Sequence, residues 1–493
     1  MDAVLQGFVL VADPFNLLLI VVGVLVGVLV GALPGLSSPL AISLLLPFTF
    51  GLPPVPAISM LAALYCAGTY GGSITAILIN TPGAPPAVAT AFDGYPMAKR
   101  GEAGRALGLA TVSSATGGVL SLLVFLVATP LLSDIALHFR PPEYFALALF
   151  ALSMLASISG KSPLRNLIAG ASGVLVGTVG VHLTTGVERF TFDLSALQDG
   201  VHFVPVLIGL FAVSELLSQA QERTGLAERI TSVVVRLPSW AEIRALRWLM
   251  LRSAGIGTFI GILPAEGSTV AAIVGYNEAR RWSRTPELFG TGCAEGIVGP
   301  ETANNAATGG AMVPTLALGI PGSATTAVIL AALIMHGLRP GPHLMSHTPE
   351  LVYAIFASML LANLAFFGVG LLGAKLFSRI TLVPKELLWP AVFIFSLVGA
   401  YAYSSSLFDV WVTLISGVVG FVMRRHGFGA APLVMGLILG QILEESLSQS
   451  MILFDNRWLR FFESPIALFF FAITLAGLAR PVLRALRRPR GAA

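Results

Sequence analysis

One phrase rich in glycine, proline and apolar residues occurs twice in this 493-residue chain, once in each half. The copies end in Asn80-Thr81-Pro82-Gly83 and in Gly319-Ile320-Pro321-Gly322. A shorter phrase precedes each copy, as 31–35 (Gly-Ala-Leu-Pro-Gly) and as 261–265 (Gly-Ile-Leu-Pro-Ala). All four lie in apolar stretches long enough to enter a bilayer. Paired, broken apolar segments in the two halves of a membrane chain point to a binding site between them, so this repetition constrains the fold most.

The composition places the chain in a membrane. It is 55% hydrophobic and 11% charged, whereas a soluble protein carries about 25% charged residues. Several apolar runs, such as 15–30 and 351–372, approach the roughly 20 residues that a helix needs to cross hydrocarbon. These runs are too long and too uniformly apolar for barrel strands. We therefore predict an all-α polytopic membrane protein. Residues 1–14 lack the basic segment of a cleaved signal, and we expect the first apolar run to be part of the mature protein.

The two halves are predicted to be structural repeats, because further short matches follow the first in the same order. The expected organisation is a first repeat over residues 1–220, a cytoplasmic linker over 221–247, and a second repeat over 248–450. A final transmembrane helix and a basic cytoplasmic tail occupy 451–493. Chance similarity among apolar sequences is the alternative, and it explains one matching phrase more easily than several in order.

Loop charges predict that the repeats are inverted. Five arginines near the C-terminus indicate that this end is cytoplasmic, because Lys and Arg concentrate in cytoplasmic loops. Counting back through the apolar runs, each loop of the first half faces the side opposite to its counterpart in the second half. An inverted pair can generate two equivalent conformations by exchanging the roles of its halves, which suits alternating access. Paired hairpins favour an elevator-like movement over rocking.

The glycine and proline phrases predict where the helices break. We expect two re-entrant hairpins with tips near 34–37 and 264–267, and two broken helices near 80–83 and 320–323. Broken backbone is tolerated at membrane depth only where it lines a cavity or is packed in protein, and a hydroxyl residue that begins a new helix leaves amides open to an anion. Structural kinks and helix packing are the alternative. The predicted substrate-binding residues are Pro34, Gly35, Ser37, Ser38, Thr81, Pro82, Gly83, Gly267, Ser268, Thr269, Pro321, Gly322 and Ser323.

A cation is expected to share this site. Asn80, Asn304 and Asn305 offer amide oxygens suited to a hard ion such as Na⁺. Glu301 is the acidic residue best placed for a coupling or gating role, although it equally fits an aqueous helix end. No Lys or Arg occurs in 55–92 or in 291–335. Because helix termini offer a carboxylate only about 0.3–2 kcal/mol, an anionic substrate would need co-bound cations. We expect no cofactor besides this coupling ion, Na⁺ or H⁺.

Other features favour transport over catalysis. No metal-binding His pair and no phosphate-binding loop occur, and the two cysteines suggest neither a disulfide framework nor a metal site. Asp93 is expected to cap a loop, and Glu266 to complement the helix that follows it. A channel would need a continuous polar path, an enzyme a converging nucleophile and base, and a scaffold subunit would not need the breaks.

The same motifs resemble a known family. The phrases at 31–35, 68–73, 80–83, 93–96, 299–305 and 319–323 are similar to those of the large permease subunit of the tripartite tricarboxylate transporters, the TctA family. The resemblance covers nearly the whole chain. It implies a multi-pass protein of the bacterial inner membrane that works with a small membrane subunit (TctB-like) and a periplasmic solute-binding protein (TctC-like). It also implies ion-gradient-driven import of carboxylates by symport, with citrate as the default and dicarboxylates or aromatic carboxylates as alternatives. No nucleic-acid partner and no enzymatic activity are expected.

Overall fold

The computed structural model describes residues 2–155, 162–182, 184–221, 235–264, 267–372 and 385–487, and most of them are helical. The elements of the first part are α1 (Asp2–Val11), α2 (Pro14–Ala32), α3 (Ser38–Thr49), α4 (Pro54–Ile79), η1 (Pro85–Ala87), α5 (Val88–Met97), η2 (Ala98–Glu102), α6 (Ala103–Ala136), α7 (Pro141–Met154), α8 (Pro163–Gly177), β1 (Gly180–Val181), β2 (Glu188–Arg189), η4 (Ser195–Leu197), α9 (Phe203–Ile208), η5 (Gly209–Val213) and α10 (Ser214–Gln219).

The elements of the second part are α11 (Trp240–Ile262), α12 (Gly267–Trp282), η6 (Pro286–Leu288), α13 (Glu295–Leu318), α14 (Ala324–Met335), α15 (Pro342–His347), α16 (Pro349–Leu372), α18 (Lys385–Ser404), α19 (Leu407–Arg425), α20 (Ala430–Leu453), η7 (Trp458–Glu463) and α21 (Pro465–Arg487).

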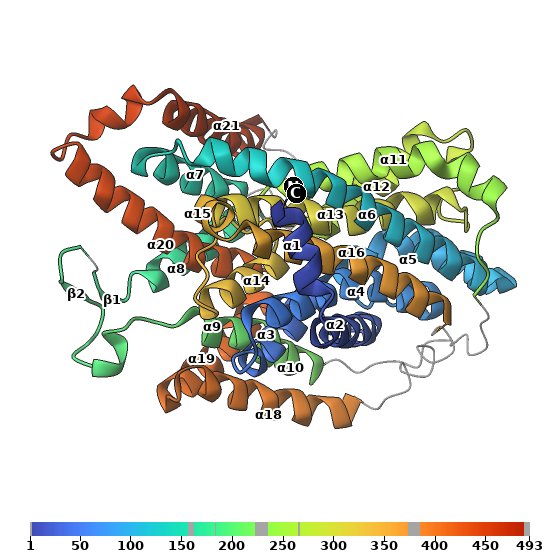
Figure 1. Ribbon diagram of the computed structural model, residues 1–493, viewed down its shortest axis with the longest axis horizontal. Coiled ribbons are helices and arrows are strands. Elements are labelled where there is room, and N and C mark those ends of the chain that lie inside the picture. The colour runs from blue at the N-terminus through green and yellow to red at the C-terminus, as the bar shows by residue number, and fades with distance from the viewer. Residues whose placement is uncertain are drawn as a thin grey trace.

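Six helical segments in the described part of the chain are long and apolar enough to cross a membrane. The predicted class, an all-α polytopic membrane protein, is confirmed. One small exception is the antiparallel pairing of β1 with β2 at the left edge of Figure 1, far from α11 and α12 at the upper right. At the centre lie α4 and α13, which are buried along nearly their whole length. Both helices are therefore surrounded by protein, and the polar residues that they carry, such as Ser73 and Glu301, are buried with the apolar ones.

The first half contains a helical hairpin that precedes α4. Glycines of α2 pack in register on α4: a Cβ at Gly23 would lie 2.3 Å from the carbonyl oxygen of Met60, and one at Gly31 would lie 2.3 Å from that of Gly68. Later residues of α2 thus contact later residues of α4, so the two helices run in the same direction. The chain must therefore return through α3, which makes α2 and α3 a hairpin with its tip at residues 33–37. Asp13 begins the hairpin by accepting a hydrogen bond from the amide of Phe15 at 3.0 Å, as N-cap residues do.

The second half repeats this arrangement. A Cβ at Gly257 would lie 2.1 Å from the carbonyl oxygen of Ala303, and one at Gly261 would lie 2.5 Å from that of Ala307. Helices α11 and α13 therefore run in the same direction, and α12 carries the chain back between them. Across the centre, α4 and α13 run in opposite directions, since Ser73 contacts Glu301 while Cys66, two turns earlier, contacts Thr308, two turns later.

One predicted boundary falls inside a helix of the structure. The linker was expected to extend to residue 247, but α11 begins at Trp240, where the Ser239 side chain accepts a hydrogen bond from the amide of Glu242. Charged residues of this first turn and the next suggested a loop, whereas they belong to a helix that continues into the apolar region. Residues 222–234 of the linker, Ala265 and Glu266 of the second hairpin tip, and the last arginines of the tail lie outside the described residues.

Candidate functional site

One cavity of about 950 Å³ gathers the starts of four helices. Its walls include residues at the starts of α3 (Ser37, Ser38), of the short 3-10 helix η1 (Pro85, Pro86), of α12 (Ser268, Thr269) and of α14 (Ser323, Thr325). Two of these helices come from the hairpins and two follow the breaks. The N-terminal turn of a helix presents unpaired amides and the positive end of its dipole. Three such ends, those of α3, α12 and α14, form an environment that favours an anion, whereas Pro85 and Pro86 of η1 have no amide hydrogen to donate.

The hydroxyl groups at these helix starts are used differently. Ser323 caps α14, because its Oγ accepts the amide of Thr326 at 3.1 Å and its own amide donates to Thr326 Oγ1 at 2.9 Å. The Ser37 side chain makes no capping hydrogen bond to α3. Tyr65 of α4 reaches the cavity, with its hydroxyl 3.4 Å from Ser323 Oγ. The cavity therefore has hydroxyl donors on at least three elements besides its backbone amides.

The two breaks that lead into the cavity have matching backbones. Asn80 and Gly319 end α4 and α13 in the left-handed conformation, with φ of 53° and 71°. At the same distance along each copy, Gly83 and Gly322 press against the tip of the hairpin of their own half. A Cβ at Gly83 would lie 2.0 Å from the carbonyl oxygen of Gly31, and one at Gly322 would lie 2.7 Å from that of Gly261. Glycine is required there because the backbones touch.

The structure brings part of the predicted substrate set to the cavity. Six of these residues line it: Ser37, Ser38, Gly267, Ser268, Thr269 and Ser323. The remaining seven do not line it: Pro34, Gly35, Thr81, Pro82, Gly83, Pro321 and Gly322. Gly83 and Gly322 lie behind the wall, where they pack on the hairpin tips, and Gly35 packs on the side chain of Gln219. Breaks in the backbone thus position the helix starts, and the residues after each break, rather than the glycines and prolines themselves, face the cavity.

Sequence reasoning missed the basic side chains of the cavity. Arg165, at the start of α8, and Arg424 and Arg425, at the end of α19, are among its lining residues. Arg165 Nη1 donates to the carbonyl oxygen of His426 at 2.7 Å, and Arg424 pairs with Glu215 of α10. The expectation that this site would lack basic residues is therefore wrong. Tertiary packing places α8 and the α19–α20 connection at the cavity, and no local sequence motif indicates that their arginines line it.

The predicted cation-binding residues lie away from the cavity lining. Asn80 is exposed, whereas Glu301, Asn304 and Asn305 are completely or almost completely buried in α13. Within the described part of the chain, the Asn304 side chain makes no hydrogen bond. Asn305 Oδ1 accepts none, and the Thr302 hydroxyl neither donates nor accepts one. Buried polar atoms normally have partners. These unpaired oxygens have the chemistry of ligands to a hard cation.

Asp93 caps a loop, which agrees with the expectation for this residue, although the loop belongs to the other half. Its carboxylate on α5 accepts the amides of Gly290, Gly292 and Cys293 at 2.8–3.0 Å and the hydroxyl of Tyr276 at 3.0 Å. Burial and the charge of Asp93 raise the pKa of the Cys293 thiol to about 12. Asp93 therefore joins the element after the first break to the loop before α13.

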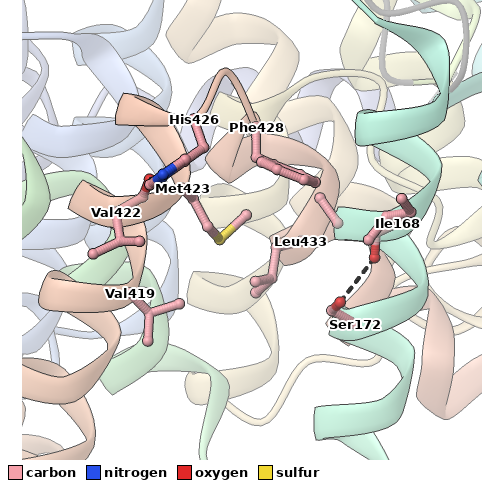
Figure 2. A pocket seen from close by; sticks show the side chains of 9 residues that line it. Ile168, Ser172, Val419, Val422, Met423, His426, Phe428 and Leu433 are labelled. Atoms are coloured by element: carbon pink, nitrogen blue, oxygen red, sulfur yellow. Dashed lines mark hydrogen bonds between the residues drawn. The ribbon is translucent and has the colours of Figure 1, made fainter.

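A second, apolar cavity of about 360 Å³ adjoins the first across His426 and Phe428. Figure 2 shows Ile168 and Ser172 of α8 on one side and Val419 and Met423 of α19 on the other. The hydroxyl hydrogen of Ser172 is not available to a ligand, because it donates to the Ile168 carbonyl oxygen at 2.8 Å. A carboxylate would find few hydrogen-bond donors here, so the larger cavity is the candidate site.

These features define a polytopic α-helical membrane protein in which paired hairpins and broken helices surround a cavity suited to an anion, the construction of a membrane transporter. Residues 17–435 match the model of the tripartite tricarboxylate transporter TctA family, and the chain belongs to this family. It is a transporter family, not an enzyme family.

Two relatives come from Agrobacterium vitis. One, described as "Uncharacterized 52.8 kDa protein in TAR-I ttuC' 3'region", is 38% identical over 484 residues, which cover 98% of this chain and 96% of the relative. The other, described as "Uncharacterized protein in TAR-II ttuC' 3'region", is 36% identical over 234 residues, covering 48% of this chain and 97% of the relative. No solved structure matches the chain.

Proposed function

We propose that this chain is the permease subunit of a binding-protein-dependent tripartite transporter, and that it imports small carboxylates in symport with a cation. Citrate is the default substrate, and a dicarboxylate or an aromatic carboxylate is the alternative within the family. The observation that carries this proposal is the convergence of three α-helix starts, those of α3, α12 and α14, and three arginines on one cavity of about 950 Å³, because this combination suits a carboxylate.

The partners follow from the family. A TctC-like solute-binding protein delivers the substrate from the periplasm, and a TctB-like small subunit accompanies the permease in the bacterial inner membrane. In the proposed orientation the C-terminus is cytoplasmic. The cavity then opens toward the cytoplasm, since Arg165, Arg424 and Arg425, which line it, lie at helix ends that the positive-inside rule assigns to that side.

We further propose that the two halves are inverted repeats that move as an elevator. Support comes from the matched direction of α2 with α4 and of α11 with α13, and from the opposite directions of α4 and α13. The unit of hairpins and broken helices would carry the substrate past α8, α19 and α20. In this movement the arginines of α8 and α19 would separate from the helix starts and release a bound carboxylate.

Cation coupling rests on α13. The argument from missing positive charge no longer applies, because arginines line the cavity. Instead, the buried and unpaired oxygens of Thr302 and Asn305, which are one turn apart on one face of α13, support a Na⁺ site, whereas Asn304 lies on another face of the helix. A bound ion would satisfy them, and its loss would leave costly unpaired groups in the membrane. Asn80, being exposed at the end of α4, is the member of the predicted set with the least support.

Uptake into proteoliposomes that contain the chain and both partner subunits tests the proposal. A panel of radiolabelled carboxylates would be offered with and without an inward Na⁺ gradient and with and without an imposed pH gradient. We expect at least one carboxylate to accumulate against its own gradient when a cation gradient is imposed. Flux that ignores every ion gradient would indicate a channel instead, and a chemically converted product would indicate an enzyme.

A further inference from the structure

The β1–β2 hairpin, at the left edge of Figure 1, exposes large apolar side chains on a loop that is held in place. Phe190, Phe192 and Leu194 follow β2, and each is more than half exposed, with 78% for Phe192. The loop is fixed by the pairing of β1 with β2 and by Gln198, whose side chain donates to Glu188 at 2.9 Å. Exposed apolar side chains gathered in this way mark an interaction surface.

The backbone of the same segment is strained. Phe190, Phe192 and Asp193 have φ of 54°, 50° and 58°, in the left-handed region. They are three of the seven non-glycine residues with positive φ in the described part of the chain, and they lie within four positions. Side chains other than glycine adopt this conformation at a cost, which proteins retain at binding sites. Because both phenylalanines are exposed, packing within this chain does not offset that cost.

A polar cavity of about 360 Å³ opens beside the hairpin, between the loop and α20. Arg189 of the loop is paired with Glu444 of α20, and His182 Nε2 lies 3.1 Å from the same carboxylate. Asp199 and Glu445 also line the cavity and are exposed. Within the described residues, neither of these two carboxylates forms an ion pair. The cavity therefore offers two uncompensated negative charges.

Residues 178–202 and 441–448, which we call the hairpin surface, are acidic although the chain as a whole carries a net charge of +4. The carboxylates outnumber the single arginine by five to one, and they belong to Glu188, Asp193, Asp199, Glu444 and Glu445. A surface of one sign attracts ligands of the opposite sign and repels its own. The hairpin surface therefore disfavours a carboxylate substrate and favours a basic side chain.

The hairpin surface lies at the opposite end of two helices from the carboxylate cavity. Helix α8 begins near Arg165, which lines that cavity, and ends at Gly177, which lines the polar one. Helix α20 begins at Ala430 in the carboxylate cavity and reaches Glu444 and Glu445 about four turns later. In the proposed orientation, with a cytoplasmic C-terminus, the hairpin surface therefore faces the periplasm.

We propose that the hairpin surface is where the periplasmic solute-binding protein docks. The partner would place a lysine or arginine in the polar cavity, near Asp199 and Glu445, and an apolar patch on Phe190 and Phe192. This inference rests on the proposed tripartite function and goes beyond it, because it assigns the contact to named residues. Aromatic anchors beside complementary charges are the combination that carries binding energy and fixes register in protein interfaces.

Two other occupants fit the hairpin surface less well. The outer leaflet of the membrane would have to accept Asp193 together with its neighbours Phe192 and Leu194, and a carboxylate is disfavoured in a bilayer. A second copy of this chain in a symmetric dimer would place the same acidic surface against itself. Five carboxylates on each side would then repel one another.

The test measures binding of the purified solute-binding protein to the permease and its small subunit in nanodiscs, and uptake into proteoliposomes at increasing concentrations of that protein. We expect Phe192→Ser and Glu445→Lys each to raise the Kd and the half-saturating concentration at least about tenfold. The rate of uptake at saturation should stay at the wild-type level, because neither residue lines the carboxylate cavity. Rising salt should weaken binding by the wild type more than by Glu445→Lys.

Matched controls make the same changes in η7, which follows α20 on the same side of the membrane. Leu459→Ser alters an apolar residue that is 81% exposed, and Glu463→Lys reverses an exposed charge. Neither Leu459 nor Glu463 lines the polar cavity. Both controls should bind the solute-binding protein with the Kd of the wild type.

Several results would overturn the proposal. One is a Kd at the level of the controls in either Phe192→Ser or Glu445→Lys. Another is quenching of the added fluorescence of Phe192→Trp by brominated lipids, which would place the hairpin in the bilayer. A change of oligomeric state in Phe192→Ser, measured by light scattering, would assign the hairpin surface to a second copy. A wild-type complex that binds the solute-binding protein and moves no carboxylate would instead refute the proposed function.

Discussion

The break after α4 and the break after α13 have the same backbone but different side chains. Both end a helix in the left-handed conformation, and both press a glycine onto a hairpin tip. After the second break, α14 starts at once with Ser323 and Thr326 capping each other's amides. After the first, the chain continues through Ala84, Pro85 and Pro86, with no side-chain cap. The shared backbone positions the helix starts, while the side chains determine what each start offers to a ligand.

Because of this difference, the two halves supply hydroxyl groups to the cavity from different elements. The second break supplies the hydroxyls of Ser323 and Thr325, whereas the first presents apolar and proline residues, and the hydroxyls of the first half come from Ser37 and Ser38 on α3. The two breaks thus share a backbone pattern and differ in the chemistry of the residues that follow. Substitutions at matched positions should separate what the two copies share from what each contributes alone.

The largest effect is expected for valine at the glycines of the two breaks. Gly83→Val would place a Cβ 2.0 Å from the Gly31 carbonyl oxygen, and Gly322→Val would place one 2.7 Å from that of Gly261. We expect both variants to lose uptake, with Gly83→Val destabilised by about 3 kcal/mol or more and Gly322→Val by less. Thermal unfolding of the purified variants measures the order of their stabilities, and uptake into proteoliposomes measures the loss of transport. Gly255→Val is the control, because a Cβ there meets nothing within 4 Å. Equal stability of Gly83→Val and Gly255→Val would contradict the packing seen at the first break.

A smaller effect is expected at the two serines that begin helices. Ser323→Ala removes the cap of α14 and should destabilise the protein by about 1 kcal/mol. Ser37 caps nothing, so Ser37→Ala should leave unfolding unchanged. In both variants the KM for the carboxylate should rise about tenfold if the hydroxyl donates to the charged substrate. Comparison of unfolding temperatures with uptake kinetics separates the two roles. An unchanged KM in Ser37→Ala would remove this hydroxyl from the site.

The arginines should contribute less, because they are partly exposed. Arg165→Gln is expected to raise KM a few-fold, in line with about 0.2–1 kcal/mol for an exposed charge pair. The increase should shrink at high salt, since the exposed part of the interaction is screened. Kinetics at two ionic strengths measure it. Arg460→Gln, which lies in η7 and not in the cavity lining, provides the comparison. Identical kinetics in the two variants would exclude Arg165 from substrate binding.

The last prediction concerns a chemical reactivity and not transport. It tests the loop before α13, which Asp93 joins to the first half. The pKa of Cys293 is raised to about 12, so its thiol stays protonated at neutral pH and its reactive thiolate forms only as the pH rises. In a Cys66→Ser background, we expect maleimide labelling at pH 8 to be on the order of 10²–10³-fold slower in the folded protein than in detergent-denatured protein. Rapid labelling of the folded state would show that this loop is open.

The sequence predicted the parts of this molecule that depend on local chemistry. Glycine and proline weaken apolar helices, and their clusters led to predicted breaks near 80–83 and 320–323, next to the helix ends at Ile79 and Leu318, although single prolines such as Pro130 lie inside continuous helices. The burial of Asn304 and the hydrogen bonds that Ser73, Thr90 and Ser114 donate to Glu301 could not be predicted, since they depend on how α4, α5 and α6 pack around α13. The arginines of the cavity were missed for the same reason, and the start of α11 was misjudged because its first two turns are charged.

The helix starts that line the cavity come from both halves, and α4 and α13, which lead to two of them, run in opposite directions. A polypeptide of half this length would build only one side of the enclosure. Under the proposed inverted repeat, a half-length transporter would have to insert in both orientations and pair with its own opposite copy. A single fused chain has no such need, so the apolar start of η1 and the capped start of α14 are free to differ.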